Sequence, residues 1–212
     1  MGQREQIVQV AAGEVGYKEY ANNNNIFGVW YGMNNQPWCA MFVSWCAEQV
    51  GALGKNNKSG IIPKTAWVPD YQTYYSSKGL YKPKGSYTPQ SGDIILYGSN
   101  SHVGLVESCA NGKVVTIEGN TSANGNSSNG DGVYRRTRSL TDSWIKGYCV
   151  PEYEEEGDEV RYQKISEIPS WGKETVEKLI DKGIIQGNTK GLDISDDMLR
   201  VLVWNDRAGL YD

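Results

Sequence analysis

Residues 36–45 read Gln36-Pro37-Trp38-Cys39-Ala40-Met41-Phe42-Val43-Ser44-Trp45, and this segment predicts a buried helix. Pro37 suits the entrance of a helix, Gly51 suits its end, and apolar residues between them cover nearly every side. Cys39 would lie in the first turn, where unpaired backbone amides and the positive end of the helix dipole favour a thiolate. A small core cysteine is the alternative interpretation of the same position.

Helical periodicity also predicts a helix over residues 4–15, ended by Gly16, and another over residues 66–78, ended by Gly79. Asn22-Asn23-Asn24-Asn25 is predicted to be a polar loop. After Gly79 the pattern changes to that of strands, which are predicted over residues 93–97, 102–107, 113–118, 133–136 and 145–150. Helices followed by an antiparallel sheet indicate an α+β domain.

The second and third of these strands predict a hairpin turned at Asn111-Gly112. A two-residue turn in a regular hairpin would set Leu105 opposite Glu118, so that His102 and Glu118 point to opposite faces. A three-residue loop, or a one-residue bulge elsewhere in the hairpin, sets Gly104 opposite Glu118 instead. We expect this second register, through the three-residue loop or an equivalent one-residue bulge elsewhere in the hairpin, because it places His102 and Glu118 on one face, and Gly104 leaves space for the buried helix.

The composition limits the classes of partner. The 212 residues carry a formal net charge of −4 and are 39% hydrophobic, which indicates a folded protein with no electrostatic reason to bind nucleic acid or an anionic membrane. No segment approaches the roughly 20 apolar residues that span a bilayer, and the first residues form no apolar run of signal-peptide length. We therefore expect no nucleic-acid or membrane partner, and synthesis in the cytoplasm without a signal peptide.

Residues 152–159 are mostly acidic and almost devoid of apolar side chains, which is typical of a solvated linker. They predict a main domain over residues 1–151 and a small module over residues 160–212. Apolar periodicity up to Gly183, and again after a helix cap at Ser195, predicts a helical hairpin in this module. Because a core of that size is marginal, we expect the module to dock on a surface or to form a homo-oligomer.

His102 is the only histidine, which excludes zinc sites built on two histidines. The four cysteines lack Cys-x-x-Cys spacing and are expected to be free thiols. His102 begins a strand after Gly98-Ser99-Asn100-Ser101, so its ring can be held rigidly beside a cleft. Glu118 and Asn120 close the neighbouring strand, where an acceptor would fix the imidazole tautomer. Taken singly, a surface histidine and a solvated acid are the alternatives.

Together these motifs resemble the CHAP family, the cysteine, histidine-dependent amidohydrolases/peptidases. The resemblance rests on Gln36-Pro37-Trp38-Cys39, Ser101-His102-Val103-Gly104 and Ile117-Glu118-Gly119-Asn120, with Ser91-Gly92-Asp93-Ile94 and the closing Trp144-Ile145-Lys146-Gly147-Tyr148. It covers the chain from about Gln6 to Tyr153. It implies a papain-like catalytic domain over residues 1–151, in which N-terminal helices pack on an antiparallel sheet.

The resemblance implies a peptidoglycan hydrolase of the phage endolysin type, released to act on the cell wall. Cys39 would be the nucleophile, His102 the general base and then the acid, and Glu118 the residue that orients it, with Asn120 as a further polar contact. The Cys39 backbone amide, at the start of its helix, is a candidate donor to the oxyanion, and Gln36 either adds its side chain to this site or simply precedes the helix. N-acetylmuramoyl-L-alanine amidase and peptidoglycan endopeptidase activities both remain open.

No cofactor is expected, and no structural metal, because the loops Asn22–Asn25 and Asn124–Asp131 are poor in carboxylates. Residues 160–212 resemble a single S-layer homology motif through Ile168-Pro169-Ser170-Trp171 and Gly183-Ile184-Ile185-Gln186-Gly187, although that family's Thr-Arg-Ala-Glu is replaced by Ser195-Asp196-Asp197-Met198. This resemblance implies binding to a Gram-positive wall, with self-association as the alternative. A non-catalytic wall-binding or assembly protein, and a cysteine amidohydrolase acting on another amide, remain as alternatives for the whole chain.

Overall fold

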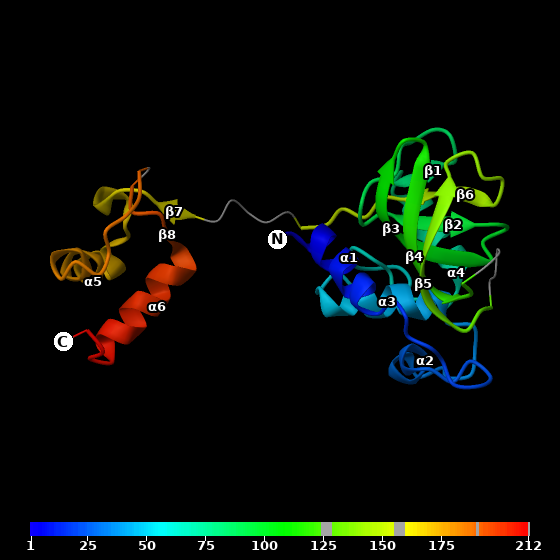
Figure 1. The fold of residues 1–212 in the computed structure, drawn as a ribbon, viewed down its shortest axis with the longest axis horizontal. Helices are drawn as coiled ribbons and strands as arrows, with labels where there is room; N and C mark the ends of the chain where they lie inside the picture. Colours follow the sequence, from blue (N-terminus) through cyan, green and yellow to red (C-terminus); the bar gives the residue numbers. More distant parts are fainter. Residues whose placement is uncertain (124–128, 155–159, 190, 212) are drawn as a thin grey trace. The chain divides into compact units, whose positions relative to one another are not determined.

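The computed structural model describes residues 1–123, 129–154, 160–189 and 191–211. The chain forms two compact units, Met1–Glu155 and Glu156–Asp212 (Figure 1). Of the predicted linker, residues 155–159 lie outside the described part, as do residues 124–128 of the acid-poor loop. Tyr153, inside the predicted linker, is instead packed in the first unit, where its hydroxyl donates to the carbonyl of Gly92 at 2.6 Å.

Four helices precede the sheet in the first unit: α1 (Gln3–Gly13), α2 (Ile26–Tyr31), α3 (Cys39–Gln49) and α4 (Val68–Ser77). The helices predicted near residues 4–15, 37–51 and 66–78 are confirmed as α1, α3 and α4. Helix α2 was not predicted, since six residues are too few for a periodic signal. It begins at Asn25, whose side-chain oxygen accepts from the amide of Gly28 at 2.8 Å and caps the helix.

The sheet has the strand order β1-β6-β2-β3-β4-β5, and every neighbouring pair is antiparallel. Its strands are β1 (Tyr81–Pro83), β2 (Ile94–Tyr97), β3 (His102–Ala110), β4 (Lys113–Thr121), β5 (Gly132–Ser139) and β6 (Ile145–Cys149). The five predicted strands are present, and the expected α+β class is confirmed. Strand β1 was missed because it is short and holds Pro83, which suits only an edge strand.

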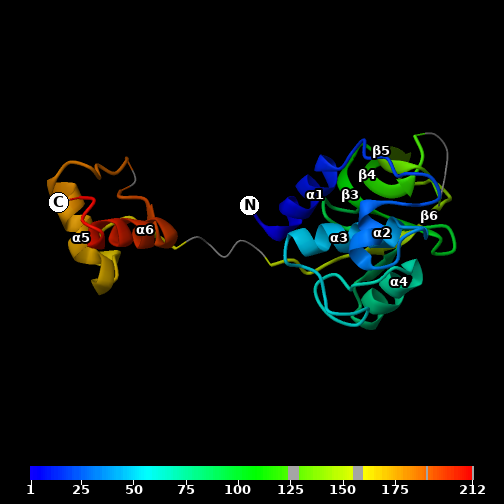
Figure 2. The same ribbon diagram turned by 90° about the horizontal axis from the view of Figure 1, so that it is seen from below.

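Helix α3 packs on β3 and β4, with α1 beside it (Figures 1 and 2). Its residues Cys39 to Ser44 are all buried, as its sequence predicts. The close approach depends on Gly119 in β4, where an added Cβ would lie 2.7 Å from Phe42 and from Trp38. The small residue that admits the helix is therefore Gly119, and the expectation that Gly104 serves this purpose is wrong.

The β3–β4 hairpin corrects one prediction and confirms its alternative. Ala110 pairs with Lys113, so the turn has two residues, and the expected three-residue loop is wrong. Both turn residues have positive φ, 51° at Asn111 and 72° at Gly112, as the common Asn-Gly turn requires. The register shifts between Val106 and Ser108, so the extra residue is Glu107 and the one-residue bulge lies inside β3.

The second unit contains β7 (Arg161–Tyr162), a short 3-10 helix (Ile165–Glu167), α5 (Ser170–Asp181), β8 (Ile194–Ser195) and α6 (Asp196–Arg207). Two helices were predicted here, whereas the two-stranded β7–β8 sheet was not. A separate small core forms from Tyr162, Ile168, Val176, Ile194, Leu199 and Val203. Across the described ranges of both units, no helix combines the length and apolar character that crossing a membrane requires.

Candidate active site

Cys39 is the first residue of α3. The preceding Trp38 is fully buried, stacks on Phe27 with ring centroids 5.2 Å apart, and donates from Nε1 to the Glu19 carboxylate at 2.5 Å. These contacts fix the start of the helix. Because the first amides of a helix have no partner within the helix, the turn that carries Cys39 has backbone donors that the helix itself does not use. Cys39 is 4% exposed, whereas Cys46 and Cys149 are fully buried.

His102 is the first residue of β3 and is completely buried. Its Nε2 lies 3.1 Å from Oε2 of Glu118. Among the described residues Nδ1 has no hydrogen-bond partner of standard geometry, yet the Cys39 side chain is close enough to interact with the ring. The imidazole therefore lies between a carboxylate on one edge and the thiol on the other.

The imidazole plane is held by stacked aromatic rings. The ring of Trp144 lies 5.7 Å from that of His102 at an interplanar angle of 12°, and the ring of Tyr97 lies 5.8 Å away at 27°. Tyr97 and Trp144 also stack on each other at 4.6 Å. Rotation of the imidazole out of line with Glu118 would break these contacts.

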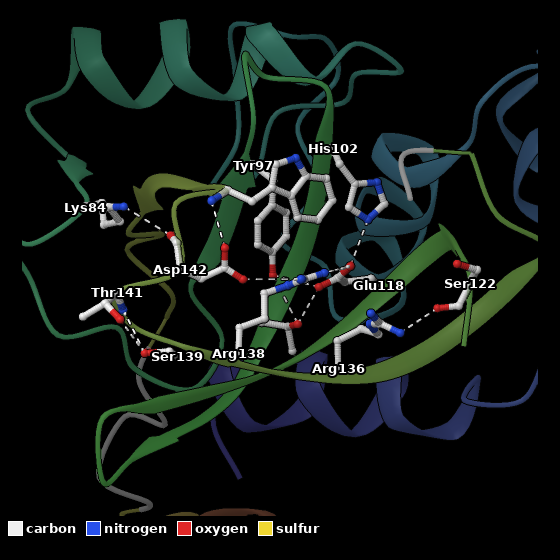
Figure 3. Close-up of polar contacts among 12 residues, drawn as sticks. Lys84, Tyr97, His102, Glu118, Ser122, Arg136, Arg138, Ser139, Thr141 and Asp142 are labelled. Atoms are coloured by element: carbon white, nitrogen blue, oxygen red, sulfur yellow. Dashed lines mark hydrogen bonds and ion pairs between the residues drawn. The ribbon is translucent and has the colours of Figure 1, made fainter. Parts of the chain in front are cut away.

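Glu118 lies in the interior of β4 and is also completely buried. Its Oε1 accepts from the Tyr97 hydroxyl at 2.7 Å and from the Thr116 hydroxyl at 2.6 Å, while Oε2 faces His102 and lies 3.6 Å from Nη2 of Arg138 (Figure 3). Both carboxylate oxygens therefore have polar partners, and the ionised carboxylate acts only as a hydrogen-bond acceptor. Gly104 is required here, since a Cβ at that position would lie 2.6 Å from the Glu118 Cγ.

The ionisation of this pair follows from its surroundings. Burial alone would lower the pKa of His102, but its interaction with the nearby Cys39 side chain and its hydrogen bond with the Glu118 carboxylate raise it to about 9. Burial alone would raise the pKa of Glu118, but its hydrogen bond to His102 and the charges of His102 and Arg138 lower it to about 2. Around neutral pH the pair is an imidazolium and a carboxylate.

The remaining candidates lie in different surroundings. Asn120 is buried at the end of β4 with a left-handed φ of 55°, and its carbonyl accepts from the Gly130 amide at 2.9 Å. Gln36 is exposed in the segment that precedes α3. The structure thus brings together Cys39, His102 and Glu118, places Asn120 two residues beyond Glu118, and leaves Gln36 at the surface.

Four residues around the pair were not predicted as part of the site: Tyr97, Thr116, Arg138 and Trp144. Arg138 had the least indication in the sequence of belonging to the site, because charged residues in strands are ordinarily on the exposed face. Trp144 was noted only as the first residue of the motif Trp144-Ile145-Lys146-Gly147-Tyr148, which contributes to the family resemblance. In the part of the chain that the structure describes, no group of three or more His, Cys, Asp or Glu residues could hold a metal ion.

Comparison with known proteins supports the family resemblance. Residues 30–120 match the CHAP domain model, and this range includes Cys39, His102, Glu118 and Asn120. No curated protein sequence matches the chain. The match does not extend into residues 160–212, and the comparisons give no support to their resemblance to an S-layer homology motif.

Three solved structures are similar at low identity. The wild-type endolysin LysIME-EF1 has a TM-score of 0.45 at 15% identity, over 73% of this chain and 66% of that one. Ly7917 has a TM-score of 0.44 at 16% identity, over 76% and 65%. The Resuscitation Promoting Factor Interacting protein RipA, mutated at E444, has a TM-score of 0.41 at 16% identity, over 72% and 63%. The chain spans just under two thirds of the length of these structures.

Proposed function

We propose that the protein is a cysteine hydrolase that cleaves an amide or peptide bond of bacterial peptidoglycan. The observation that carries the proposal is the buried His102, held between the Glu118 carboxylate and Cys39 at the first turn of α3. The match to the CHAP domain model supports the choice of substrate. A phage endolysin, made in the cytoplasm and acting on the wall after release, is the form of this function that we favour.

In the proposed reaction, the Cys39 thiolate attacks the carbonyl carbon of the scissile amide while its proton resides on His102. Backbone amides at the start of α3, including that of Cys39, stabilise the oxyanion, and Gln36 is the candidate side-chain donor. The carbon–nitrogen bond then breaks as His102 gives its proton to the leaving amine, which leaves a thioester. Water adds to the thioester while His102 accepts its proton, and the sulfur departs as a thiolate.

The test compares Cys39→Ala with Cys46→Ala on purified walls and on soluble muropeptides. Both sites are buried on α3, so the pair separates chemistry from the loss of a buried sulfur. We expect Cys39→Ala to abolish hydrolysis and Cys46→Ala to retain it, with some loss of stability from the small cavity. Hydrolysis that persists in folded Cys39→Ala, or that survives iodoacetamide, would contradict the thiol mechanism.

The bond that is cut can be read from the products. An N-acetylmuramoyl-L-alanine amidase releases intact stem peptides with a new amino terminus at alanine, whereas an endopeptidase leaves shortened stems attached to the glycan. Mass spectrometry of digested walls distinguishes them. Folded protein that binds walls without releasing amino groups would instead favour a non-catalytic wall-binding role, and activity confined to other amides would favour a different amidohydrolase.

For the second unit we propose contact with the wall, with self-association as the alternative. A pocket of about 270 Å³ is lined by Trp171, Arg200, Val203, Trp204 and Arg207. Trp204 is 65% exposed, and the guanidinium of Arg200 lies 5.4 Å from the centre of the Trp171 ring. Exposed indole rings beside guanidinium groups suit a saccharide that carries negative charge.

A further inference from the structure

Arg138 is a buried cation in the wall of the candidate active site. It lies on β5, its side chain is only 4% exposed, and its Nη2 lies 3.6 Å from Oε2 of Glu118, the oxygen that also faces His102 (Figure 3). Its guanidinium lies over the rings of Tyr97 and Trp144, 4.9 and 4.7 Å from their centres. A buried cation is costly unless it is paired, so this placement indicates a specific need for positive charge.

The titratable groups around the His102–Glu118 pair come from several elements. Cys39 approaches from α3 and His102 from β3, while Tyr97 from β2 donates to Oε1. Beyond Arg138, the Asp142 carboxylate lies 3.7 Å from Nη1 and is partly exposed. Arg138 is therefore the permanent cation of the cluster, and it connects the buried carboxylate to a carboxylate near the surface.

A permanent cation matters because the charge of His102 changes during the proposed reaction. After His102 gives its proton to the leaving amine, Glu118 would be a buried anion whose Oε1 accepts, from the described residues, only the neutral hydroxyl groups of Tyr97 and Thr116. Such an anion would tend to take up a proton, and a neutral carboxyl group would no longer hold the imidazole in its reactive tautomer. Arg138 can supply the missing charge at that stage.

We propose that Arg138 is a positioning residue that keeps Glu118 ionised and turned toward His102 while His102 gains and loses its proton. The reaction cycle in this statement rests on the proposed hydrolase function, whereas the coupling between Arg138, Glu118 and His102 can be measured without it. Stacking on Trp144, whose ring lies parallel to the imidazole, gives Arg138 a second way to hold the ring in place.

The coupling between Arg138, Glu118 and His102 can be tested directly by NMR, because His102 is the only histidine in the sequence. In the full chain without a histidine tag, one imidazole NMR signal reports His102, and protonation of Glu118 next to it produces an inflection in acid. In the wild type this inflection should lie at about 2. In Arg138→Met, which keeps most of the side-chain volume but removes the charge, it should move up toward the ordinary value of 4.5.

Two variants on the same strand serve as controls. Arg138→Lys keeps the charge and should return the inflection toward that of the wild type. Arg135→Met makes the same chemical change three residues away, where Arg135 pairs with Glu107 at the surface, and should leave the titration unchanged. An acid inflection at the same pH in Arg138→Met and the wild type would overturn the proposal.

If Arg138→Met does not fold, the double variant Glu118→Gln/Arg138→Met decides the question. Removal of both charges should restore folding, because the destabilisation of the single variant would come from the uncompensated Glu118 carboxylate. A double variant as unfolded as the single one would show that Arg138 serves general packing, and would overturn the proposal.

Kinetics on soluble muropeptides complete the test. Arg138→Met should lower kcat by about tenfold to hundredfold with little change in KM, and Arg138→Lys should recover part of the loss. A shifted titration in a protein that hydrolyses no wall would reject the proposed function but retain the coupling. If the enzyme is active but Arg138→Met changes neither the titration nor kcat, the role of Arg138 is rejected and the proposed hydrolase function is retained.

Discussion

At the scale of single residues, the site is governed by one buried pair of opposite charges. The pKa of His102 in the folded protein is raised from 6.5 to about 9, so its contribution to stability is complete below pH 6.5 and is lost as the pH rises through 9. The pKa of Glu118 is lowered from 4.5 to about 2, so its contribution is complete above pH 4.5 and is lost as the pH falls through 2. Both contributions are complete between pH 4.5 and 6.5.

We therefore expect the unfolding free energy to fall as the pH rises from 6.5 toward 9, by an amount that Glu118→Gln reduces, because the neutral amide no longer stabilises the imidazolium while the contribution of Cys39 remains. Urea unfolding at a series of pH values measures this difference. The activity should decline over the same alkaline range as His102 loses the proton for the leaving amine. An identical pH dependence in both proteins would show that the pair does not contribute as described.

Gly104 gives a second prediction at this scale. A Cβ there would lie 2.6 Å from the Glu118 Cγ and 3.1 Å from the Ile117 carbonyl, so Gly104→Ala must displace the carboxylate or the backbone. We expect a loss of about 1–3 kcal/mol in stability and a larger proportional loss of activity. Gly13→Ala is the matched control, because nothing lies within 4 Å of its added Cβ. Wild-type activity in Gly104→Ala would mean that Glu118 does not need its present position.

At the scale of elements, the β3–β4 hairpin aligns the base with its carboxylate. The two-residue turn alone would put His102 and Glu118 on opposite faces. The bulge at Glu107 restores Leu105 opposite Ile117, and continuation of that register brings His102 to the same face as Glu118. One extra residue, located where β3 leaves the site, therefore determines whether the site can form.

The position of the bulge predicts that the domain tolerates deletion of Glu107. Deletion of Glu107 leaves Val106 opposite Thr116 and Ser108 opposite Val115, so both halves of the hairpin keep their partners and faces. We expect this variant to fold, to keep the His102 titration, and to lose only about 1 kcal/mol. Deletion of Leu105 is the control: it also removes one residue, but it forces Glu107 into the buried position of Val106 and should unfold the domain. Equal damage from the two deletions would contradict this account of the register.

At the scale of the whole molecule, the chain consists of two units with separate hydrophobic cores. The first contains Cys39, His102 and Glu118, and the second contains neither cysteine nor histidine. Since each unit buries its own apolar side chains, chemistry and attachment can be separated by experiment.

Residues 1–154 alone should hydrolyse soluble muropeptides at the rate of the full chain but bind insoluble walls less tightly. In the full chain, Trp204→Ala should weaken wall binding, because it removes an exposed ring from the pocket of the second unit, while hydrolysis of soluble fragments stays unchanged. Val201→Ala, an exposed apolar change on the same helix, is the control. Binding is measured by sedimentation with walls, and light scattering reports self-association. Unaltered wall binding in Trp204→Ala would exclude this pocket as the contact.

Features that depend on residues close together in the chain could be predicted from the amino-acid sequence. The apolar run after Pro37 specified a buried helix with Cys39 in its first turn, and alternation between glycine-rich turns specified five of the six strands in the main sheet. The pairing of His102 with Glu118 could be expected only because the family motif and the chemistry required it; the Asn-Gly turn taken alone favoured the opposite arrangement.

Three features became evident only in the folded protein: the position of the extra residue in the hairpin, the glycine that lets α3 approach the sheet, and the strand residue that supplies the buried cation. Nothing local distinguishes Glu107 as a bulge, since its position follows from pairing with a strand that comes later in the chain. Arg138 has the same local signal as an exposed strand arginine. Its burial is favourable because Glu118, Tyr97 and Trp144 converge on it from other elements, and that convergence is a property of the folded protein.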